Sequence, residues 1–265
     1  MNSTSPIDYE LWPTAYLGGE CGGASSPDKV ALIILNSPIA GYEYFRRLYE
    51  HASIRICADG GANRVHDLLA QQHPDDDDLA VLRRLPPTVI HGDLDSLLPD
   101  VRKKYESIGV EVTEDEDQYS TDFGKAIKQV MARMPGVCDI LVLGSLGGRV
   151  DQGLGLLSEL HREQKVNHPG VRFWLFTEAS VSTIITPGIT KLHTSLDQGL
   201  IKRNVGILPM YGPSVMTISG FEWDVSDWHT EMGGNISTSN HIIADCVTVK
   251  TSNDMLFTVE RAVGR

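Results

Sequence analysis

The chain has 265 residues, and its 35 acidic side chains against 23 basic ones give a net charge of −12 with histidine neutral. This balance argues against nucleic acids and anionic membranes as partners, because both require a basic surface. With 41% hydrophobic and 22% charged residues, the composition is that of a globular protein with a sizeable core. Domains usually hold roughly 100 to 150 residues, so one large domain or two modest ones fit this length.

The cysteines and the N-terminal segment favour a reducing, cytoplasmic location. The four cysteines form no CxxC pair, and we expect them to be buried free thiols. They are Cys21, Cys57, Cys138 and Cys246. The first thirty residues lack the basic start and apolar middle of a secretory signal. No stretch approaches the ~20 apolar residues that span a bilayer.

The first two thirds of the chain are typical of a parallel α/β sheet. Residues 1–29 are turn-rich without periodicity, so we expect an irregular lead-in. From Val30 onward, short apolar runs alternate with amphipathic segments. The predicted strands are 30–36, 54–58, 88–91, 110–113, 139–144 and 172–177. The predicted helices are 42–50, 62–70, 100–108, 121–134 and 150–163. We therefore predict an α/β domain over residues 30–180.

The last third has a different pattern. Beyond Ser180 the helical period disappears, and short β-branched runs separated by proline, glycine or asparagine take over. These runs are 181–186, 205–210, 215–218, 242–250 and 255–259. They predict a smaller antiparallel β domain over residues 181–265. We assign no function to residues 1–29 or 189–204, and we find no internal repeat of solenoid period.

Acidic and glycine residues recur where open α/β sheets bind ligands, beyond the carboxyl ends of the strands. Four separate segments bring such residues toward this edge. They supply Asp59, Gly60, Gly61 and Asn63 after strand 54–58; Asp93 and Asp95 after strand 88–91; Asp122 at the start of helix 121–134; and Gly147, Gly148, Arg149 and Asp151 after strand 139–144. We expect these side chains to lie close together.

Each of these features has a structural interpretation when it is taken alone. An Asp-x-Asp pair often caps a turn, Asp122 is in a normal helix-capping position, and the glycines allow tight turns. Yet Asp93 and Asp95 are two residues apart, so both carboxylates lie on one side of an extended segment. Paired carboxylate oxygens are ligands that Mg²⁺ prefers. The coincidence of all these residues at one edge favours a site for a metal and phosphate.

The segment Gly147–Arg149 offers backbone amides, a helix N-terminus and a guanidinium group, all suited to a polyphosphate. No Walker A or GxGxxG pattern occurs, so a nucleotide would be held by metal and arginine. Zinc spacing and a GxSxG elbow are also absent, which disfavours a zinc enzyme and an α/β hydrolase. We interpret residues 75–78 and 114–117 as solvated loops, with a contribution of Asp117 or Gln118 to the site left open.

Seven short motifs follow one another along the chain. They are Ala58–Asn63, Gly92–Ser96, Asp117–Phe123, Leu146–Gln152, Thr186–Gly188, Gly220–Trp223 and Ser237–Asn240. In this combination the chain resembles the thiamin pyrophosphokinase family, whose members transfer pyrophosphate from ATP to thiamin. The resemblance implies a Rossmann-like α/β catalytic domain and a β-sandwich thiamin-binding domain. It also implies Mg²⁺ and a homodimer with active sites between the subunits.

The resemblance also assigns roles by motif. Asp93, Asp95 and Asp122 would be the Mg²⁺ ligands. Position alone favours Asp122 or Asp59 as the carboxylate that accepts the hydroxyl proton. The nucleotide and catalytic residues would be Asp59, Gly60, Gly61, Asn63, Gly147, Gly148, Arg149 and Asp151. The thiamin residues would be Gln118, Trp223, Ser237, Ser239 and Asn240, with the vitamin pocket facing the partner subunit.

Two matters stay open at the level of sequence. The stretch after Trp223 is longer than is usual in the family, so Trp228 is an alternative partner for the thiamin ring. Other functions also fit the residues: a metal-dependent phosphohydrolase with Asp93 as the covalent nucleophile, or a non-catalytic sensor of thiamin or nucleotide.

Overall fold

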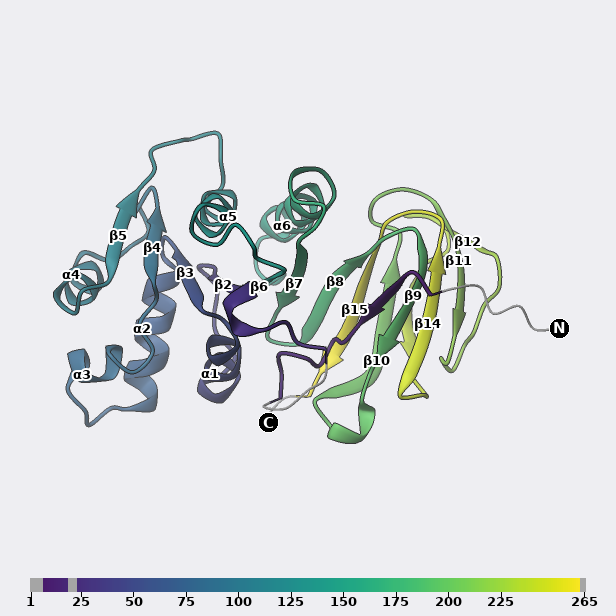
Figure 1. Cartoon of the computed structure of the whole chain (residues 1–265), viewed down its shortest axis with the longest axis horizontal. Helices are drawn as coiled ribbons and strands as arrows, with labels where there is room; N and C mark the ends of the chain where they lie inside the picture. Colours follow the sequence, from purple (N-terminus) through teal and green to yellow (C-terminus); the bar gives the residue numbers. More distant parts are fainter. Residues whose placement is uncertain (1–6, 19–22, 263–265) are drawn as a thin grey trace. The chain divides into compact units, whose positions relative to one another are not determined.

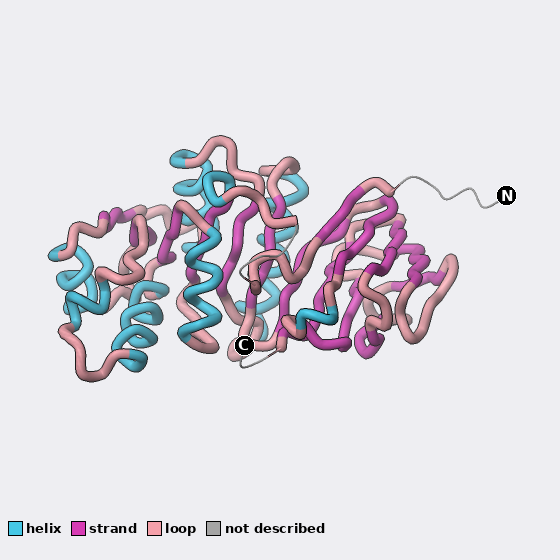
Figure 2. Tube along the Cα trace, turned by 60° about the horizontal axis from the view of Figure 1, so that its bottom comes forward, coloured by secondary structure: helices cyan, strands magenta, loops and turns pink. Residues whose placement is uncertain are grey.

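The computed structural model describes residues 7–18 and 23–262, which divide into two compact units. The α/β unit is formed by residues 25–178. The β unit combines the described residues before Ser25 with those from Ala179 onward. Apart from the short 3-10 turn Leu196–Gln198, the helices of Figure 2 belong to the α/β unit.

Six parallel strands form the sheet of the α/β unit, in the order β7-β6-β2-β3-β4-β5. The strands are β2 (Val30–Ile34), β3 (Ile54–Ala58), β4 (Val89–Gly92), β5 (Glu111–Glu114), β6 (Asp139–Leu143) and β7 (Arg172–Phe176). The central strands β2 and β6 are buried along their whole length, because helices cover both faces of a parallel sheet. The predicted α/β fold is confirmed.

Figure 1 shows α1 and α2 on one face of this sheet and α5 and α6 on the other. The helices are α1 (Tyr42–His51), α2 (Gly61–Gln72), α3 (Asp78–Leu82), α4 (Pro99–Ser107), α5 (Asp122–Arg133) and α6 (Val150–Arg162), which a π-helical turn (Glu163–Asn167) extends. Residues 75–77 form the exposed loop that was predicted, and only Asp78 departs from it by beginning the short helix α3. The Asp77 carboxylate accepts the Ala80 N–H at 2.9 Å, so an aspartate of the acidic run acts as the helix cap.

The β unit is built of two sets of paired strands, which confirms the prediction of a β-rich second domain. Four strands pair antiparallel in the order β13-β10-β15-β8, with β8 (Ser180–Ile185), β10 (Ile201–Leu208), β13 (Ser237–His241) and β15 (Met255–Arg261). The five-stranded sheet has the order β1-β9-β14-β11-β12, with β1 (Tyr9–Leu11), β9 (Gly188–His193), β11 (Ser214–Ser219), β12 (Trp228–Thr230) and β14 (Cys246–Thr251).

Several strands of the β unit depart from the predictions. The segment expected to be an irregular lead-in contains β1, which pairs in parallel with β9, and the side chains of residues 15–17 are buried. The strands β9, β12 and β13 were not predicted. Each of these strands is a short run of mixed polarity without a clear alternating pattern. Pairing with neighbouring strands therefore determines them, and the local sequence does not. The run predicted at 242–250 becomes a regular strand only at Cys246, because Ile242 forms an isolated bridge and residues 244–245 form a bend.

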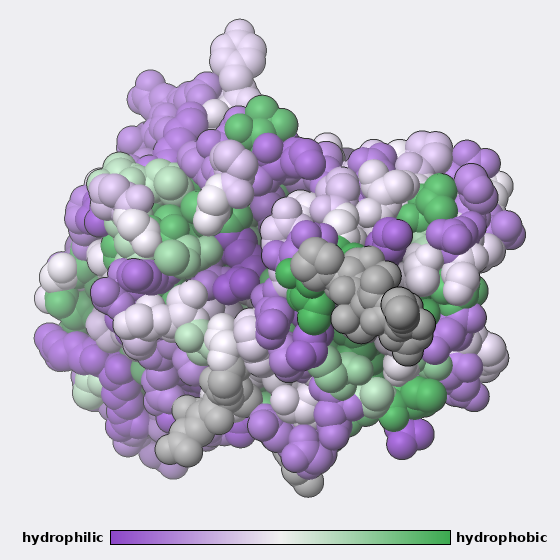
Figure 3. All heavy atoms as spheres, turned by 45° about the vertical axis from the view of Figure 1, so that its right-hand side comes forward, coloured by the Kyte–Doolittle hydropathy of each residue, from purple (hydrophilic) through white to green (hydrophobic). Residues whose placement is uncertain are grey.

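The polarity of the surface agrees with the composition, whereas the burial of the cysteines agrees with the prediction only in part. On the face drawn in Figure 3, hydrophilic side chains dominate and apolar ones form small separate patches. No helix within residues 7–18 and 23–262 is long and apolar enough to cross a membrane. Cys57, Cys138 and Cys246 are free thiols, but only Cys57 is buried, which corrects the expectation for the other two. Cys21 lies outside the described residues.

Candidate active site

The predicted carboxylates gather at the carboxyl ends of β3 and β4. Asp59 directly follows β3 and has a left-handed backbone with φ of 43°. Its side chain is 1% exposed, and Oδ2 accepts the Ser96 N–H at 3.0 Å. Among the described residues, Oδ1 has no hydrogen-bond donor. Burial raises the pKa of Asp59. A strained, buried carboxylate with an unsatisfied oxygen is unusual in a purely structural role.

Gly92, the last residue of β4, allows two carboxylates to approach each other. A Cβ at this position would lie 2.8 Å from the Asp59 Cβ and 3.0 Å from the Asp122 Oδ1. Contacts this short do not occur at real Cβ atoms without movement of the neighbours, so residue 92 must be glycine in this arrangement. Strands β3 and β4 and helix α5 therefore bring their acidic residues to one point.

Asp93 and Asp95 complete this acidic cluster. Each of Asp59, Asp93 and Asp95 offers a carboxylate oxygen, and these three atoms lie within 4.8 Å of one another. Leu94 adopts a left-handed conformation with φ of 63°, which turns the segment between the two aspartates. Burial raises the pKa of Asp93, but hydrogen bonds from the Asp95 backbone and from Lys125 outweigh it, and the pKa is lowered overall.

Asp122 is the first residue of α5, and the residue before it, Thr121, caps the helix. The Thr121 hydroxyl accepts the Gly124 N–H at 3.0 Å, as in a normal N-cap. Because Thr121 caps the helix, the carboxylate of Asp122 is not used as a cap and can take part in the acidic cluster. Its Oδ1 is buried without a hydrogen-bond donor among the described residues. Burial, followed by the charges of Asp93 and Asp59, raises the pKa of Asp122 to about 6.

Lys125 is the residue of this cluster that the sequence analysis missed. Its side chain is 1% exposed, and Nζ lies 3.3 Å from Asp93 Oδ2 and 3.9 Å from Asp122 Oδ1. A signal was present, because residues three apart on a helix share a face and Lys125 follows Asp122 by three. The cluster thus contains a resident positive charge beside its carboxylates.

The donor set fits a hard divalent cation. Four carboxylates converge, and the two buried oxygens without donors, Asp59 Oδ1 and Asp122 Oδ1, are available as ligands. Lys125 by itself does not balance these charges. The predicted ligands were Asp93, Asp95 and Asp122, whereas the closest grouping of oxygens replaces Asp122 by Asp59. Oxygen ligands of this kind suit Mg²⁺ better than a soft metal.

The predicted glycines and asparagine after β3 have packing roles. A Cβ at Gly60 would lie 2.4 Å from the Asn36 side chain, and one at Gly61 would lie 2.2 Å from the Ile34 carbonyl oxygen. Both ends of the Asn63 amide are engaged: Nδ2 donates to the Ser96 carbonyl at 2.8 Å, and Oδ1 accepts the Leu98 N–H at 3.1 Å. Asn63 thus holds the loop that carries Asp93 and Asp95.

Arg149 and Asp151 lie at the start of α6 and pair with each other. The Arg149 Nη2 and the Asp151 Oδ2 are 2.5 Å apart, and both side chains are exposed. Gly148 has φ of 81°, a conformation that favours glycine, and the Gly147 N–H donates to the Ser145 hydroxyl at 3.0 Å. No contact within the described residues joins Arg149 or Asp151 to the carboxylate cluster. Gln118 lies in the exposed loop before α5, and its amide donates to the Glu116 carbonyl at 3.4 Å.

In the β unit, Asn240 of β13 holds Trp223. Its Oδ1 accepts the Trp223 N–H at 3.2 Å, and its Nδ2 donates to the Trp223 carbonyl at 2.9 Å. The indole is 54% exposed and lies 5.2 Å from the His241 ring. Ser237 and Ser239 belong to the same strand as Asn240. By contrast, Trp228 begins β12 in the other sheet, opposite Met216.

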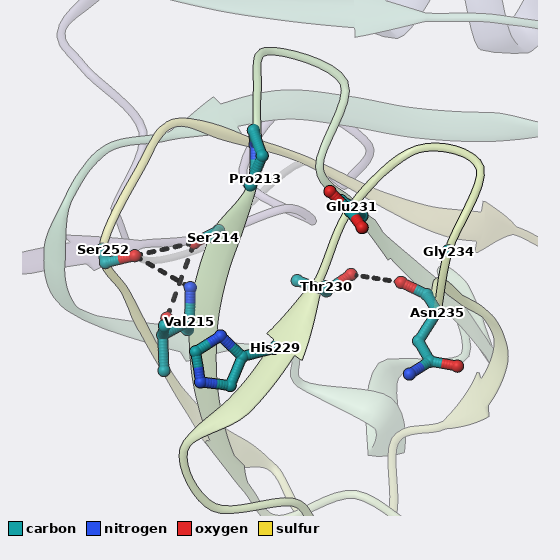
Figure 4. Close-up of a pocket in the computed structure, with 9 residues that line it drawn as sticks. All are labelled: Pro213, Ser214, Val215, His229, Thr230, Glu231, Gly234, Asn235 and Ser252. Atoms are coloured by element: carbon teal, nitrogen blue, oxygen red, sulfur yellow. Dashed lines mark hydrogen bonds between the residues drawn. The ribbon is translucent and has the colours of Figure 1, made fainter.

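A pocket of about 380 Å³ lies elsewhere in the β unit, and Figure 4 shows its lining. It is lined by Pro213, Ser214, Val215, His229, Thr230, Glu231, Gly234, Asn235 and Ser252. Its hydroxyl groups bond within the pocket wall, as Thr230 does to the Asn235 carbonyl at 2.7 Å. None of the predicted site residues lines this pocket, so we do not identify it with the thiamin site.

Comparison with known proteins gives consistent matches in both units. The chain matches the family model "Thiamin pyrophosphokinase, catalytic domain" over residues 45–171 and "Thiamin pyrophosphokinase, vitamin B1 binding domain" over residues 190–256. It is 34% identical to thiamine pyrophosphokinase 1 of Arabidopsis thaliana, over 96% of this chain and 94% of the plant protein.

Solved structures of thiamin pyrophosphokinases have the same fold as this chain. The yeast thiamin pyrophosphokinase structure has a TM-score of 0.84 at 25% identity, covering 99% of this chain and 94% of the yeast chain. The thiamin pyrophosphokinase from Candida albicans has a TM-score of 0.80 at 25% identity, covering 97% and 94% of the two chains.

Proposed function

Because the chain belongs to the thiamin pyrophosphokinase family, we propose that it transfers the pyrophosphoryl group of ATP to the hydroxyl of thiamin with the help of Mg²⁺. As an enzyme of this family, it converts thiamin to thiamin diphosphate. The observation that carries the finer assignment is the convergence of Asp59, Asp93, Asp95 and Asp122 at the end of β4. A group of carboxylates whose charge Lys125 offsets only in part is suited to a cation that an anionic substrate brings with it.

In this proposal Asp93, Asp95 and Asp122 hold Mg²⁺, and Asp59 supports the same site. When it is bound there, Mg²⁺ would offset the negative charge that develops on the phosphoryl oxygens. The Arg149 guanidinium and the amides of Gly147 and Gly148 would bind the phosphates of ATP at the start of α6. Gly60, Gly61 and Asn63 would keep the loop after β3 close to the nucleotide, and Asp151 would orient Arg149.

The reaction has a simple balance of atoms. The thiamin hydroxyl oxygen forms a bond to the β-phosphorus of ATP, and the bond from that phosphorus to the oxygen of the α-phosphate breaks, so AMP leaves with the electron pair. The hydroxyl proton passes to a carboxylate. We assign this role to Asp59 or Asp122, because each keeps a buried oxygen without a hydrogen-bond donor among the described residues.

The test of this function is a product analysis. Purified protein with ATP, Mg²⁺ and thiamin should form thiamin diphosphate and AMP in equal amounts. ADP or inorganic phosphate as the sole nucleotide-derived product would contradict the proposal. The phosphohydrolase alternative requires a phosphorylated Asp93, which trapping and peptide mass analysis would detect. A sensor would bind both ligands without any turnover.

For thiamin, we propose Ser237, Ser239 and Trp223 as binding residues of the β unit, with Asn240 holding Trp223. For the α/β unit we propose Gln118 as a thiamin-binding residue. Thiamin carries a permanent positive charge on an aromatic ring, and an exposed indole face is a favourable partner for it. The support for Trp223 over Trp228 is its exposure and its two hydrogen bonds to Asn240 of the Ser237–Asn240 motif.

Replacing the indole provides a quantitative check. Trp223→Ala should raise the KM for thiamin about 2- to 30-fold, the equivalent of a cation–π contact of roughly 0.5 to 2 kcal/mol, and change the KM for ATP little. Trp228→Ala is the matched control and should leave the KM for thiamin close to that of the wild type. Steady-state kinetics on both variants decide the matter, and the reverse order of effects would assign the role to Trp228.

A second variant checks the role of Lys125. Lys125→Met keeps the length of the buried side chain and removes its charge, so the carboxylates of Asp93 and Asp122 lose their counter-charge. In metal-free protein we expect the free energy of unfolding to fall by roughly 1 to 3 kcal/mol, less than for a fully buried pair because both carboxylates are partly exposed. Added Mg²⁺ should raise the Tm of this variant more than that of the wild type. Lys128→Met, on the exposed side of α5, is the control, and equal behaviour of the two variants would contradict the assignment.

We also propose a cytoplasmic homodimer in which each active site draws on both subunits. Exposed apolar side chains near β13, namely Ile236 and Ile243, support an interface on the β unit. The free thiols Cys57, Cys138 and Cys246 support a reducing compartment. Light scattering of the purified protein should give twice the mass of one chain.

A further inference from the structure

One glutamate of α6 contacts the first turn of α5. The side chain of Glu159 is buried, with 7% of the residue exposed, and its Oε2 accepts a hydrogen bond from the Thr121 hydroxyl at 2.6 Å. The other oxygen, Oε1, accepts a hydrogen bond from the Arg162 Nη2 at 2.8 Å. Both carboxylate oxygens are therefore engaged, and a buried charged group held in this way has a defined orientation.

The facing surface of α5 is shaped to receive this carboxylate. A Cβ at Gly124 would lie 2.9 Å from the Glu159 Oε1, so only a glycine leaves room for the glutamate where it lies. The Thr121 hydroxyl donates to Glu159 and at the same time accepts the Gly124 N–H at 3.0 Å. Glu159 thus orients the hydroxyl that caps α5, and its negative charge lies beside the positive end of that helix.

This first turn carries two residues of the carboxylate cluster. Asp122 follows Thr121 directly, and the Lys125 N–H donates to the Thr121 carbonyl at 2.9 Å. A shift of the Thr121 backbone would therefore move Asp122 and Lys125 together relative to Asp93. The helix that supplies Glu159 is also the one that begins after Arg149. Glu159 accordingly links the two helices whose N-termini carry the phosphate-binding and the metal-binding residues.

We propose that Glu159 is a positioning residue for the metal site, acting through Thr121 to hold Asp122 and Lys125 against Asp93. This inference rests on the proposed function, because it assumes that the cluster binds a divalent cation. Glu159 touches neither the cation nor the substrates. Its effect is the placement of α5, so its loss should weaken cation binding while the protein stays folded.

The chain offers a closely matched control. Glu163 is also buried, with 5% exposed, and it also bonds to Arg162, at 3.2 Å. It also contacts Asn167 at 2.9 Å and His168 at 3.5 Å, in its own turn of the chain. No contact of Glu163 with α5 is present among the described residues. Removing Glu163 therefore disturbs a buried glutamate of similar surroundings without touching Thr121.

The experiment measures Mn²⁺ binding to the full-length protein by the electron paramagnetic resonance of free Mn²⁺. Glu159→Ala should weaken Mn²⁺ roughly 10-fold or more, in the range known for residues that orient metal ligands. Glu159→Gln keeps an acceptor for Thr121 and should restore most of the affinity. Glu163→Ala should lower the Tm without changing Mn²⁺ affinity. In turnover assays, Glu159→Ala should raise the apparent KM for Mg²⁺ more than it lowers kcat at saturating Mg²⁺.

Equal Mn²⁺ affinities of Glu159→Ala and Glu163→Ala would overturn the inference. If Glu159→Ala does not fold, the pair Thr121→Val and Thr121→Ser replaces it: Ser keeps the hydroxyl and should keep Mn²⁺ affinity, whereas Val should lose it. Loss of Mn²⁺ affinity in both Thr121 variants, or in neither, would also contradict the positioning role of Glu159. A wild-type protein that binds Mn²⁺ but forms no thiamin diphosphate would instead refute the proposed function, independently of the comparison between Glu159 and Glu163.

Discussion

Asp95→Asn should lower the rate of thiamin diphosphate formation about 100- to 1000-fold and leave the fold intact. The side chain of Asp95 is exposed, and it accepts a hydrogen bond from the neighbouring Ser96 hydroxyl at 3.0 Å. Neutralising it removes charge from the metal site without leaving a cavity or an unpaired buried group. The apparent requirement for Mg²⁺ should rise, and circular dichroism and the Tm of metal-free protein should change little.

Asp100→Asn is the natural control for that experiment. Asp100 lies at the start of α4, after the same loop, and its side chain is 91% exposed. It should behave as the wild type in turnover and in Mg²⁺ titrations. Near-normal activity of Asp95→Asn at limiting Mg²⁺ would remove Asp95 from the set of ligands.

Asp122→Asn should change activity and stability in opposite directions. We expect turnover to fall about 100-fold or more, because a carboxylate of the metal site is lost. At pH 7.5 the metal-free variant should nevertheless be more stable than the metal-free wild type. The reason is that folding buries an ionised Asp122 and places it close to Asp93 and Asp59, and an amide at the same position avoids both costs.

The pH dependence of that gain follows from the sign of the pKa change. Folding raises the pKa of Asp122 to about 6, mainly through burial, so the folded state binds this proton more tightly than the unfolded state. The contribution of Asp122 to stability is complete below pH ~4 and is lost as the pH rises through about 6. Because 40% of the side chain is exposed, we expect a gain of only about 1 kcal/mol for the variant at pH 7.5. Denaturant unfolding in the presence of a chelator should show this gain at pH 7.5 and none at pH 4; a gain independent of pH would contradict the explanation.

The sequence was sufficient for the α/β unit because its elements are locally encoded. Strand β2 is a continuous apolar run that is buried throughout, and α5 has apolar residues at helical spacing, of which Phe123, Ile127 and Val130 are buried. The carboxylates could be placed for a related reason: in a parallel sheet, residues that follow successive strands meet at the same edge. That rule brought Asp59 and Asp93 together without knowledge of their contacts.

The remaining features depend on contacts that the sequence does not encode locally. In the sequence, Lys125 looks like an ordinary charged residue of an amphipathic helix. Only the packing of α5 on β3 and β4 shows that its ammonium group is buried beside Asp93. Glu159 is equally ordinary in sequence, because its partner Thr121 precedes it by 38 residues. Strand β13 is polar, and its pairing with β10 defines it. Tertiary pairing outweighs local propensity at each of these positions.

The strand β1 gives the chain an unusual order of assembly. Tyr9 pairs with Thr190, so the β unit is interrupted in sequence by the whole α/β unit, which is in effect an insertion within it. During synthesis the α/β unit can fold as soon as its own residues emerge, whereas β1 must wait until β9 has been made. A fragment that begins at residue 179 would leave β9 as an unprotected edge strand, a site for pairing with other chains. The vitamin-binding half of this enzyme is therefore not separable from the first residues of the chain by a simple cut between the two units.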